Sequence, residues 1–398
     1  NFRWVGKRTP RPDGVDKVTG RARYGDDLIV PGMLHAKILR SPHAHANIVS
    51  IDISKAQALK GVKAVITSAD IPDHPLTKPP FPPIISDLHD LSRNVMAREK
   101  VLYDGHAVAA VAATSESVAQ EALKSIEVEY EVLPHVLDPL EASKPDAPLL
   151  HDYQYTDGVD PEPEKPSNVF RVVTGRRGDV ENGFSEADVI VEREFTSEPV
   201  HQGYIEPLAC IATASEEGSV ELWTSTQGHF VVRGLCARLL KMDIAKIRVT
   251  ASEIGGGFGG KNTIYGEPVA IRLSQLTGRP VRMVMTRSEI FRATGPAPGS
   301  HTRIKMGAKN DGTITAAEAE IWYQAGAFKG ASVHRAVETF FSAYTIKNIK
   351  ASGYDVCVNQ PKVAAYRAPG APMAAFSAEG VINELASRLG MDGVDLRL

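Results

Sequence analysis

Five glycines surround one aromatic side chain at residues 255–260, which read Gly-Gly-Gly-Phe-Gly-Gly and run into Lys261. Glycine has no Cβ atom, so its backbone can adopt unusual dihedral angles and approach a ligand closely. Several N–H groups in one bare loop suit a polar or anionic ligand. Ordering this many glycines costs considerable chain entropy, which favours a binding loop over a turn that only packs.

Gly255, Gly257 and Gly260 match the glycine pattern of a dinucleotide-binding fold, G-x-G-x-x-G. That fold needs an acidic residue at the end of the next strand, where it holds a ribose. The next expected strand, 281–285, runs instead into Thr286 and Arg287. An NADP-dependent Rossmann oxidoreductase that uses Arg287 is therefore the alternative interpretation of this loop.

A phosphate-binding P-loop is matched in part by the same glycines and Lys261. Position 262 is Asn, where a magnesium-binding Ser or Thr is needed. The P-loop pattern therefore lacks its magnesium ligand, as the dinucleotide pattern lacks its acidic residue.

Gln227 lies between an expected strand, 219–225, and an expected helix, 230–240. Side chains at such junctions commonly reach ligands. A helix-capping or turn role explains Gln227 equally well, so both interpretations stay open here.

Two arginines occupy further loops. Arg335 stands near the start of a helical stretch, 334–341, where a solvated surface charge is the commoner role. If this loop faces a pocket, its guanidinium can clamp a carbonyl or carboxylate. Arg367 lies in a Pro- and Gly-rich turn between an expected strand, 351–358, and an expected helix, 374–389.

Strand, polar loop and helix thus occur three times in the second half of the chain, and they must position these side chains. The first part mixes alternating strands with short helices, such as 126–132 and 115–125. Residues 146–168 hold four prolines and several acids, which is typical of a linker. These patterns predict an α+β fold class.

Composition limits the class of protein. The chain has 398 residues, 43% hydrophobic and 23% charged, with a formal net charge of −3, which argues against a nucleic-acid surface. Its apolar runs are too short to span a bilayer. The widely spaced Cys210, Cys236 and Cys357 build neither a disulfide framework nor an iron–sulfur site, so a reducing cytoplasm is the expected location.

The chain contains Trp223-Thr224-Ser225-Thr226-Gln227, then the run from Gly255 to Lys261, then Ala365-Tyr366-Arg367-Ala368-Pro369-Gly370. In this order and spacing the three motifs resemble the molybdenum-binding subunit of the xanthine dehydrogenase and aldehyde oxidase family. The resemblance covers nearly the whole chain. It implies a hammerhead α/β domain over residues 1–145, a linker over 146–168 and a first molybdopterin-binding α+β domain over 169–398.

The resemblance implies a molybdenum ion held by a pterin dithiolene with no direct protein ligand, in molybdopterin cytosine dinucleotide. Residues expected to bind this cofactor are Gln227, Gly257, Phe258, Gly259, Arg367 and Ala368. Gln227 would hydrogen-bond the molybdenum oxo group, and the Phe258–Gly259 segment would approach the metal through its backbone. The expected activity is hydroxylation of a carbon with oxygen from water.

Gln227 and Arg335 are the expected catalytic residues, and Arg335 with Asn262 and Pro369 would face the substrate. Arg335 matches the family's substrate-orienting arginine, which stabilises a developing anion. Asn262 replaces the glutamate of purine-oxidising members, and Pro369 replaces an aromatic residue that stacks on purines. Ala368 replaces the cysteine that carries copper in the carbon monoxide dehydrogenase branch. An aromatic N-heterocycle, an aldehyde or an aryl thioester therefore remains as substrate.

Partners are implied by what the chain lacks. Electrons must leave through a [2Fe-2S] subunit and an FAD subunit, because the cysteine spacing cannot hold a cluster. The family's catalytic glutamate, in a G-V-G-E-type loop, is also missing. Glu206 is a buried structural acid by context, and Glu267 follows the glycine loop on a helix. We expect a second molybdopterin-domain chain to carry the base, split as in the nicotinate dehydrogenase branch, or a longer polypeptide of which this is a portion.

The sequence therefore predicts the cofactor-binding subunit of a heteromeric molybdenum hydroxylase. The alternatives are the NADP-dependent Rossmann oxidoreductase and a non-catalytic assembly subunit of such a complex.

Overall fold

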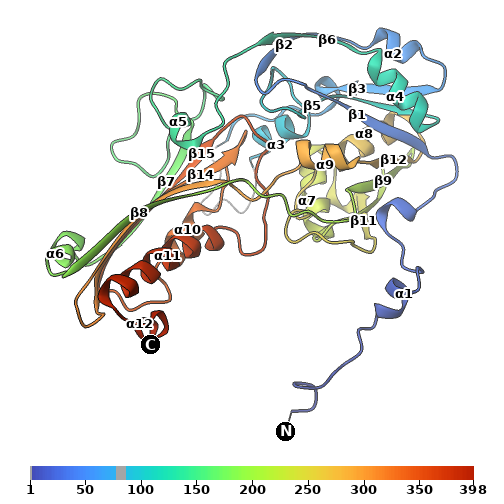
Figure 1. Cartoon of the computed structure of the whole chain (residues 1–398). Helices are drawn as coiled ribbons and strands as arrows, with labels where there is room; N and C mark the ends of the chain where they lie inside the picture. Colours follow the sequence, from blue (N-terminus) through green and yellow to red (C-terminus); the bar gives the residue numbers. More distant parts are fainter. Residues whose placement is uncertain (1, 78–86) are drawn as a thin grey trace.

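The computed structural model describes residues 2–77 and 87–398 and has an α+β fold, as predicted (Figure 1). Strands form three sheets, and each sheet draws on segments that are distant in the sequence. Among the described residues, no helix is long and apolar enough to cross a membrane.

The first sheet has the order β11-β10-β9-β12-β1-β5-β3. Its strands are β1 (Leu34–Arg40), β3 (Val62–Thr67), β5 (Ala107–Ala113), β9 (Ala209–Ala214), β10 (Val220–Thr224), β11 (Ile247–Ala251) and β12 (Val281–Val284). Strand β1 pairs in parallel with β12, so strands from both sides of the predicted linker share one sheet. The predicted domain bounds of 1–145, 146–168 and 169–398 stay a prediction.

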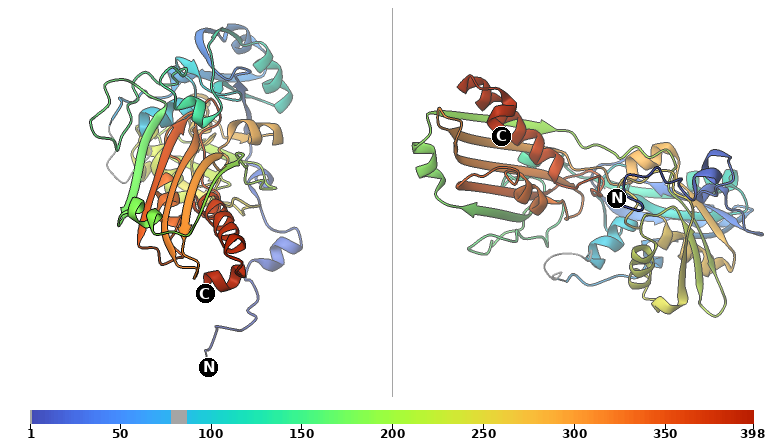
Figure 2. Two further views of the ribbon diagram at one scale, coloured as in Figure 1. Left: turned by 60° about the vertical axis from the view of Figure 1, so that its left-hand side comes forward. Right: turned by 90° about the horizontal axis from the view of Figure 1, so that it is seen from below.

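The second sheet has the order β7-β15-β14-β13-β8. Its strands are β7 (Val169–Arg177), β8 (Val189–Ser197), β13 (Ser300–Ala308), β14 (Ile314–Gly326) and β15 (Asn348–Cys357). A small third sheet contains β2 (Ala46–Asp52), β4 (Lys100–Val101) and β6 (Glu127–Val132). In Figure 2 the second sheet and the first sheet lie side by side, and loops meet between them.

Helices cover the faces and ends of the sheets. They are α1 (Gly14–Val18), α2 (Ser54–Ala58), α3 (Leu88–Val95), α4 (Glu116–Lys124), α5 (Pro139–Ala142), α6 (Val180–Ser185), α7 (His229–Leu239), α8 (Glu267–Thr277), α9 (Arg287–Ala293), α10 (Val333–Thr339), α11 (Ala371–Leu389) and α12 (Gly393–Arg397). Single turns of 3-10 helix occur at η1 (Gly25–Asp27), η2 (Ser68–Asp70) and η3 (Ile244–Lys246).

Helix α11 buries an apolar stripe against the second sheet, with Val381, Ile382 and Leu385 fully buried in the same core as Ile304 and Met306 of β13. These three residues recur at helical spacing, which is why the helix packs on this face. It begins at Ala371, three residues before the predicted start, because Pro372 is tolerated in the first turn of a helix. The start of α11 is fixed next to Gly370, whose φ is +90°.

The alternative Rossmann interpretation is wrong. In a dinucleotide-binding fold, the strand that precedes the glycine loop and the strand that follows the next helix are parallel neighbours. Here β11 and β12 are separated by β10 and β9, and β9 runs antiparallel to both of its neighbours. The glycine pattern is therefore not part of a βαβ nucleotide-binding unit.

Candidate cofactor-binding site

Two of the predicted loops leave the first sheet at the same edge. Strands β10 and β11 are parallel neighbours, so their carboxyl ends meet there. Gln227 follows β10 and the glycine run follows β11. Ligands commonly bind at this edge of α/β sheets, where bare loops gather.

Gln227 holds the glycine loop directly. Its Oε1 accepts hydrogen bonds from the backbone N–H of Gly259 at 2.8 Å and of Lys261 at 3.3 Å. Its own backbone N–H donates to the carbonyl of Lys261 at 3.0 Å. A Cβ atom on Gly257 would come within 2.5 Å of Oε1, so a side chain there would displace the Gln227 amide from the loop. Gln227 is exposed, and within the described chain its Nε2 makes no hydrogen bond to protein.

The third loop, before α11, joins the other two. The backbone N–H of Arg367 donates to the carbonyl of Phe258 at 2.9 Å. Gly259 has a φ of +108°, and a Cβ there would lie 2.7 Å from the carbonyl oxygen of Ala365. The three motifs of the sequence therefore make one contiguous structure.

Backbone strain concentrates in these loops. Phe258 and Ala368 have φ values of +51° and +61°, a left-handed conformation that residues with a side chain seldom adopt. Lys241 is the other such residue among those described, and it lies elsewhere. Conformations of this kind cost about 1–3 kcal/mol each and cluster at functional sites. Phe258 is half exposed, and its ring lies close to Gly256 of the same loop.

A buried ion pair anchors the glycine loop from below. The Nζ atom of Lys261 lies 2.8 Å from Oε2 of Glu206, and both side chains are almost completely buried. Glu206 also accepts the backbone N–H groups of Gly255 at 2.8 Å and Gly25 at 3.1 Å. Burial lowers the pKa of Lys261, and Glu206 opposes this shift. The prediction that Glu206 is a buried structural acid is confirmed.

The other candidate base, Glu267, is buried at the start of α8. It accepts a hydrogen bond from Thr224 Oγ1 at 2.8 Å and one from the N–H of Tyr265 at 2.8 Å. Burial raises its pKa. Its carboxylate is therefore buried and hydrogen-bonded within the protein.

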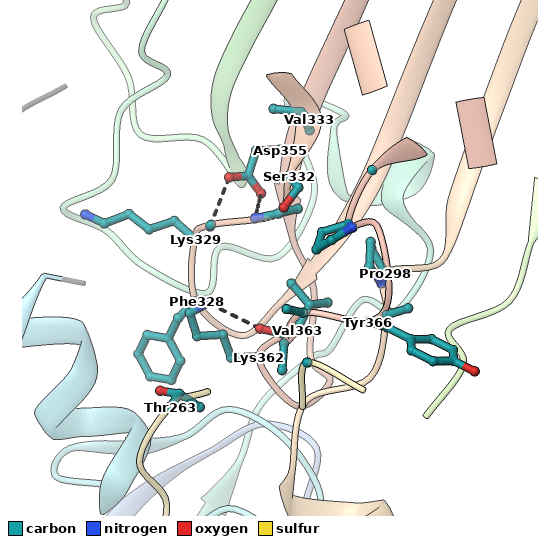
Figure 3. A pocket seen from close by; sticks show the side chains of 18 of the residues that line it. Thr263, Pro298, Phe328, Lys329, Ser332, Val333, Asp355, Lys362, Val363 and Tyr366 are labelled. Carbon is teal, nitrogen blue, oxygen red and sulfur yellow. Dashed lines mark hydrogen bonds between the residues drawn. The ribbon is translucent and has the colours of Figure 1, made fainter. Parts of the chain in front are cut away.

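A cavity of about 840 Å³ opens beside the loops, between the two larger sheets (Figure 3). Its wall includes Gly259, Asn262, Arg367, Ala368 and Pro369. Five of the predicted site residues thus face one space. Gln227, Gly257, Phe258 and Arg335 are outside this wall.

Charged groups line the opposite side of the cavity. Lys329 bridges Asp87 and Asp90, with both distances 3.3 Å. Asp355 accepts the backbone N–H groups of Gly330 and Ala331, and burial raises its pKa to about 6. Figure 3 shows this carboxylate at the loop that carries Lys329. The cavity therefore combines apolar walls with a few fixed polar groups, the usual form of a small-molecule site.

Arg335 lies next to the third loop but points into solvent. Its side chain begins so close to Gly370 that a Cβ built on Gly370 would be 2.9 Å from the Cβ of Arg335. The side chain is 65% exposed, and its guanidinium pairs with Glu338 at 3.3 Å. The predicted substrate contact requires the side chain to leave Glu338, and it stays a prediction.

Gln202 joins two of these segments, although no sequence pattern identifies it. Gln202 is buried, and its Nε2 donates to the carbonyls of Gly295 and Ala365 at 3.1 and 2.9 Å. No motif contains it, because its partners are backbone groups distant in the sequence. Lys261 stands out in the sequence only as part of an incomplete P-loop pattern, although it forms the buried pair with Glu206.

These loops offer free hydrogen-bond donors of the kind an anionic cofactor needs. In the described chain, the backbone N–H groups of Gly256, Gly257, Phe258 and Ala368 donate to no protein acceptor. Gly257 is buried, and an unpaired buried N–H group is rare in folded proteins. With Nε2 of Gln227 they fit a pterin cofactor that carries oxo and phosphate oxygens. Among residues 2–77 and 87–398, no group of three or more His, Cys, Asp or Glu side chains is arranged to hold a metal ion.

Comparison with known proteins also indicates a molybdopterin-binding site in this part of the chain. Residues 161–398 match the molybdopterin cofactor-binding domain, and residues 19–134 match the hammerhead domain of aldehyde oxidase and xanthine dehydrogenase. A probable xanthine dehydrogenase subunit of Bacillus subtilis is 34% identical over 97% of this chain and 49% of its own length. The nicotinate dehydrogenase large molybdopterin subunit of Eubacterium barkeri is 32% identical over 100% of this chain and 89% of its own.

Among solved structures, quinoline 2-oxidoreductase from Pseudomonas putida 86 superposes with a TM-score of 0.87 at 28% identity. The match covers 98% of this chain and 49% of that one. The chain thus spans about half the length of several relatives that it matches. These matches and the joined loops show that the chain belongs to the xanthine dehydrogenase and aldehyde oxidase family of molybdopterin-binding proteins.

Proposed function

We propose that this chain binds the molybdenum cofactor in a heteromeric hydroxylase that oxidises a carbon centre with oxygen from water. The observation that carries this proposal is the contact of three loops, with Gln227 on Gly259 and Phe258 on Arg367. When bound, the molybdenum cofactor supplies the redox chemistry of hydroxylation. This function rests on the free donors of these loops and on the family.

The residues of this chain would hold and orient the cofactor and the substrate. Gln227 keeps the glycine loop in place through Oε1 and presents Nε2 as a donor toward the cofactor. The backbone N–H of the strained Phe258 donates to no acceptor in the described chain and would be available to the cofactor. Arg335, released from Glu338, would pair with negative charge that develops on the substrate. Asn262 and Pro369 would shape the space in which the substrate lies.

The cofactor is proposed to be molybdopterin cytosine dinucleotide, and electrons to pass to [2Fe-2S] and FAD subunits. The three cysteines are free, buried and distant in sequence. This supports the proposal that the iron–sulfur clusters are on other chains, and it also supports a cytoplasmic location. The proton acceptor would come from a second molybdopterin-domain polypeptide, because Glu206 and Glu267 are engaged within the protein.

The substrate is proposed to be an aromatic N-heterocycle, an aldehyde or an aryl thioester. Asn262 lacks the charge with which a glutamate would bind a purine, and Pro369 cannot stack as an aromatic ring does. The names of two relatives, a nicotinate dehydrogenase and a quinoline oxidoreductase, favour the heterocycle as the first compound to assay.

Metal and cofactor analysis of the intact complex tests the function. We expect about one molybdenum per chain and release of a pterin nucleotide whose mass identifies cytosine as the base. Bound NADP in place of molybdenum, or a complex with neither, would overturn the proposal.

A further inference from the structure

The N-terminal arm, defined as residues 2–18, projects from the body in Figures 1 and 2. Every residue from 2 to 12 is exposed, and helix α1 buries no side chain. Large apolar residues on the arm are Phe2, Trp4, Val5, Val15 and Val18, with exposed fractions of 75, 64, 71, 58 and 85%. So many exposed apolar side chains on one short segment indicate a surface that another molecule covers.

The arm region is also strongly basic, whereas the whole chain has a net charge of −3. Between residues 2 and 23, the basic side chains are Arg3, Lys7, Arg8, Arg11, Lys17, Arg21 and Arg23, and the acidic ones are Asp13 and Asp16. Within the described residues, Arg3, Lys7 and Arg8 form no ion pair. Trp and Arg are the residue types that most often dominate protein–protein binding. The matching surface must therefore offer apolar pockets bordered by acidic groups.

The root of the arm is tied to the glycine loop. Lys17 forms an ion pair with Glu253, and the backbone N–H of Glu253 donates to the carbonyl of Arg23 at 2.9 Å. Glu253 precedes Gly255 by two residues. Gly25, just beyond the arm, donates to Glu206, the acid that also holds Gly255 and Lys261. The root of the arm therefore lies next to the cofactor loops.

The lengths of the relatives suggest which molecule the arm would meet. Several relatives are about twice as long as the part that this chain matches, and the hammerhead match begins at residue 19, where the arm ends. We propose that the N-terminal arm clasps a polypeptide equivalent to the unmatched half of those relatives, with Trp4 and its apolar neighbours seated on it. This inference rests on the proposed function, because that polypeptide would close the cofactor site.

Site-specific photo-crosslinking in the intact complex tests the proposal. Trp4 is replaced by p-benzoylphenylalanine, and Val49 on β2, which is 57% exposed, receives the same group as a matched control. We expect the probe at position 4 to label a polypeptide whose sequence matches the other half of the relatives. The control probe should not label it. Labelling of a second copy of this chain, of an iron–sulfur or flavin subunit, or of no protein would overturn the proposal.

Substitution gives a second readout. The variant Phe2→Ser/Trp4→Ser/Val5→Ser should weaken association with that polypeptide by roughly tenfold or more, because buried Trp side chains are frequent hot spots of protein–protein binding. The exposed arm makes no core contact, so the melting temperature of the isolated chain should not change, as for the control Val49→Ser. Unchanged association would contradict the arm's role. A complex that contains molybdenum but lacks the crosslink refutes only the arm, whereas a crosslinked complex without molybdenum refutes the proposed function.

Discussion

Gln227 connects two roles at the scale of single residues, because one amide both orders the glycine loop and leaves a donor free. The Gln227→Ala variant loses the acceptor for Gly259 and Lys261, an effect of about 1–3 kcal/mol. We expect molybdenum content to fall partially while the fold is retained. Metal analysis and circular dichroism measure the two effects, with exposed Gln57→Ala on α2 as control. Full cofactor content and activity in Gln227→Ala would refute its assignment to the cofactor.

Arg335 is the residue for which substrate binding and structure can be separated most directly. In the Arg335→Lys variant the charge remains, but the planar fork that orients a substrate is lost. We expect kcat/KM to fall by about tenfold or more with molybdenum content unchanged. Glu338→Gln removes the competing ion pair and should not lower kcat/KM. Loss of cofactor with unchanged kinetics per molybdenum would make Arg335 a structural residue.

At the scale of elements, the glycine loop depends on the buried pair beneath it. Lys261→Met leaves the Glu206 carboxylate buried without its cation, which typically costs about 3–5 kcal/mol. We expect a lower free energy of unfolding in urea and loss of cofactor. The double variant Lys261→Met/Glu206→Gln removes both charges and should recover part of this stability. If the double variant is as unstable as the sum of the single ones, the two groups do not act as a pair.

The contact between the glycine loop and the third loop leaves no room for a side chain at Gly259. Its φ of +108° and the carbonyl of Ala365 at 2.7 Å from a built Cβ both oppose substitution. Gly259→Ala should therefore displace one loop from the other, reducing cofactor content and stability by about 1–3 kcal/mol. Gly234→Ala on α7, where a Cβ meets no atom within 4 Å, is the matched control. Equal cofactor content in the two variants would show that this contact is dispensable.

At the scale of the whole molecule, the proposed function requires a proton acceptor near the cofactor loops, and we propose that it comes from outside this chain. We expect this chain, reconstituted with the cofactor alone, to show no hydroxylation at the rate of the complex. The reason is that its two nearby acids, Glu206 and Glu267, are buried and hydrogen-bonded. Measured turnover of the reconstituted chain and of the complex tests this. Equal rates would place the proton acceptor within this chain.

Local patterns are sufficient for much of the fold. Alternation and helical spacing locate β10, α7, β11, α8 and α11 to within a few residues, because these elements each bury one face. The order of the three motifs also indicates the family. The predicted start of α11 is three residues late, since a proline in a first turn looks like a break in sequence alone.

The sequence by itself determined the residue types, the positions of most helices and strands near the site, and the family. Only the tertiary structure decided which loops touch, because those contacts depend on strand order. Nothing local says that β10 and β11 are neighbours, that β10 and β9 separate β11 from β12, or that Gln202 joins Gly295 to Ala365. The partner of Lys261 is likewise 55 residues away in sequence. Long-range pairing of backbone groups leaves no periodic trace in the sequence, and here it is what assembles the site.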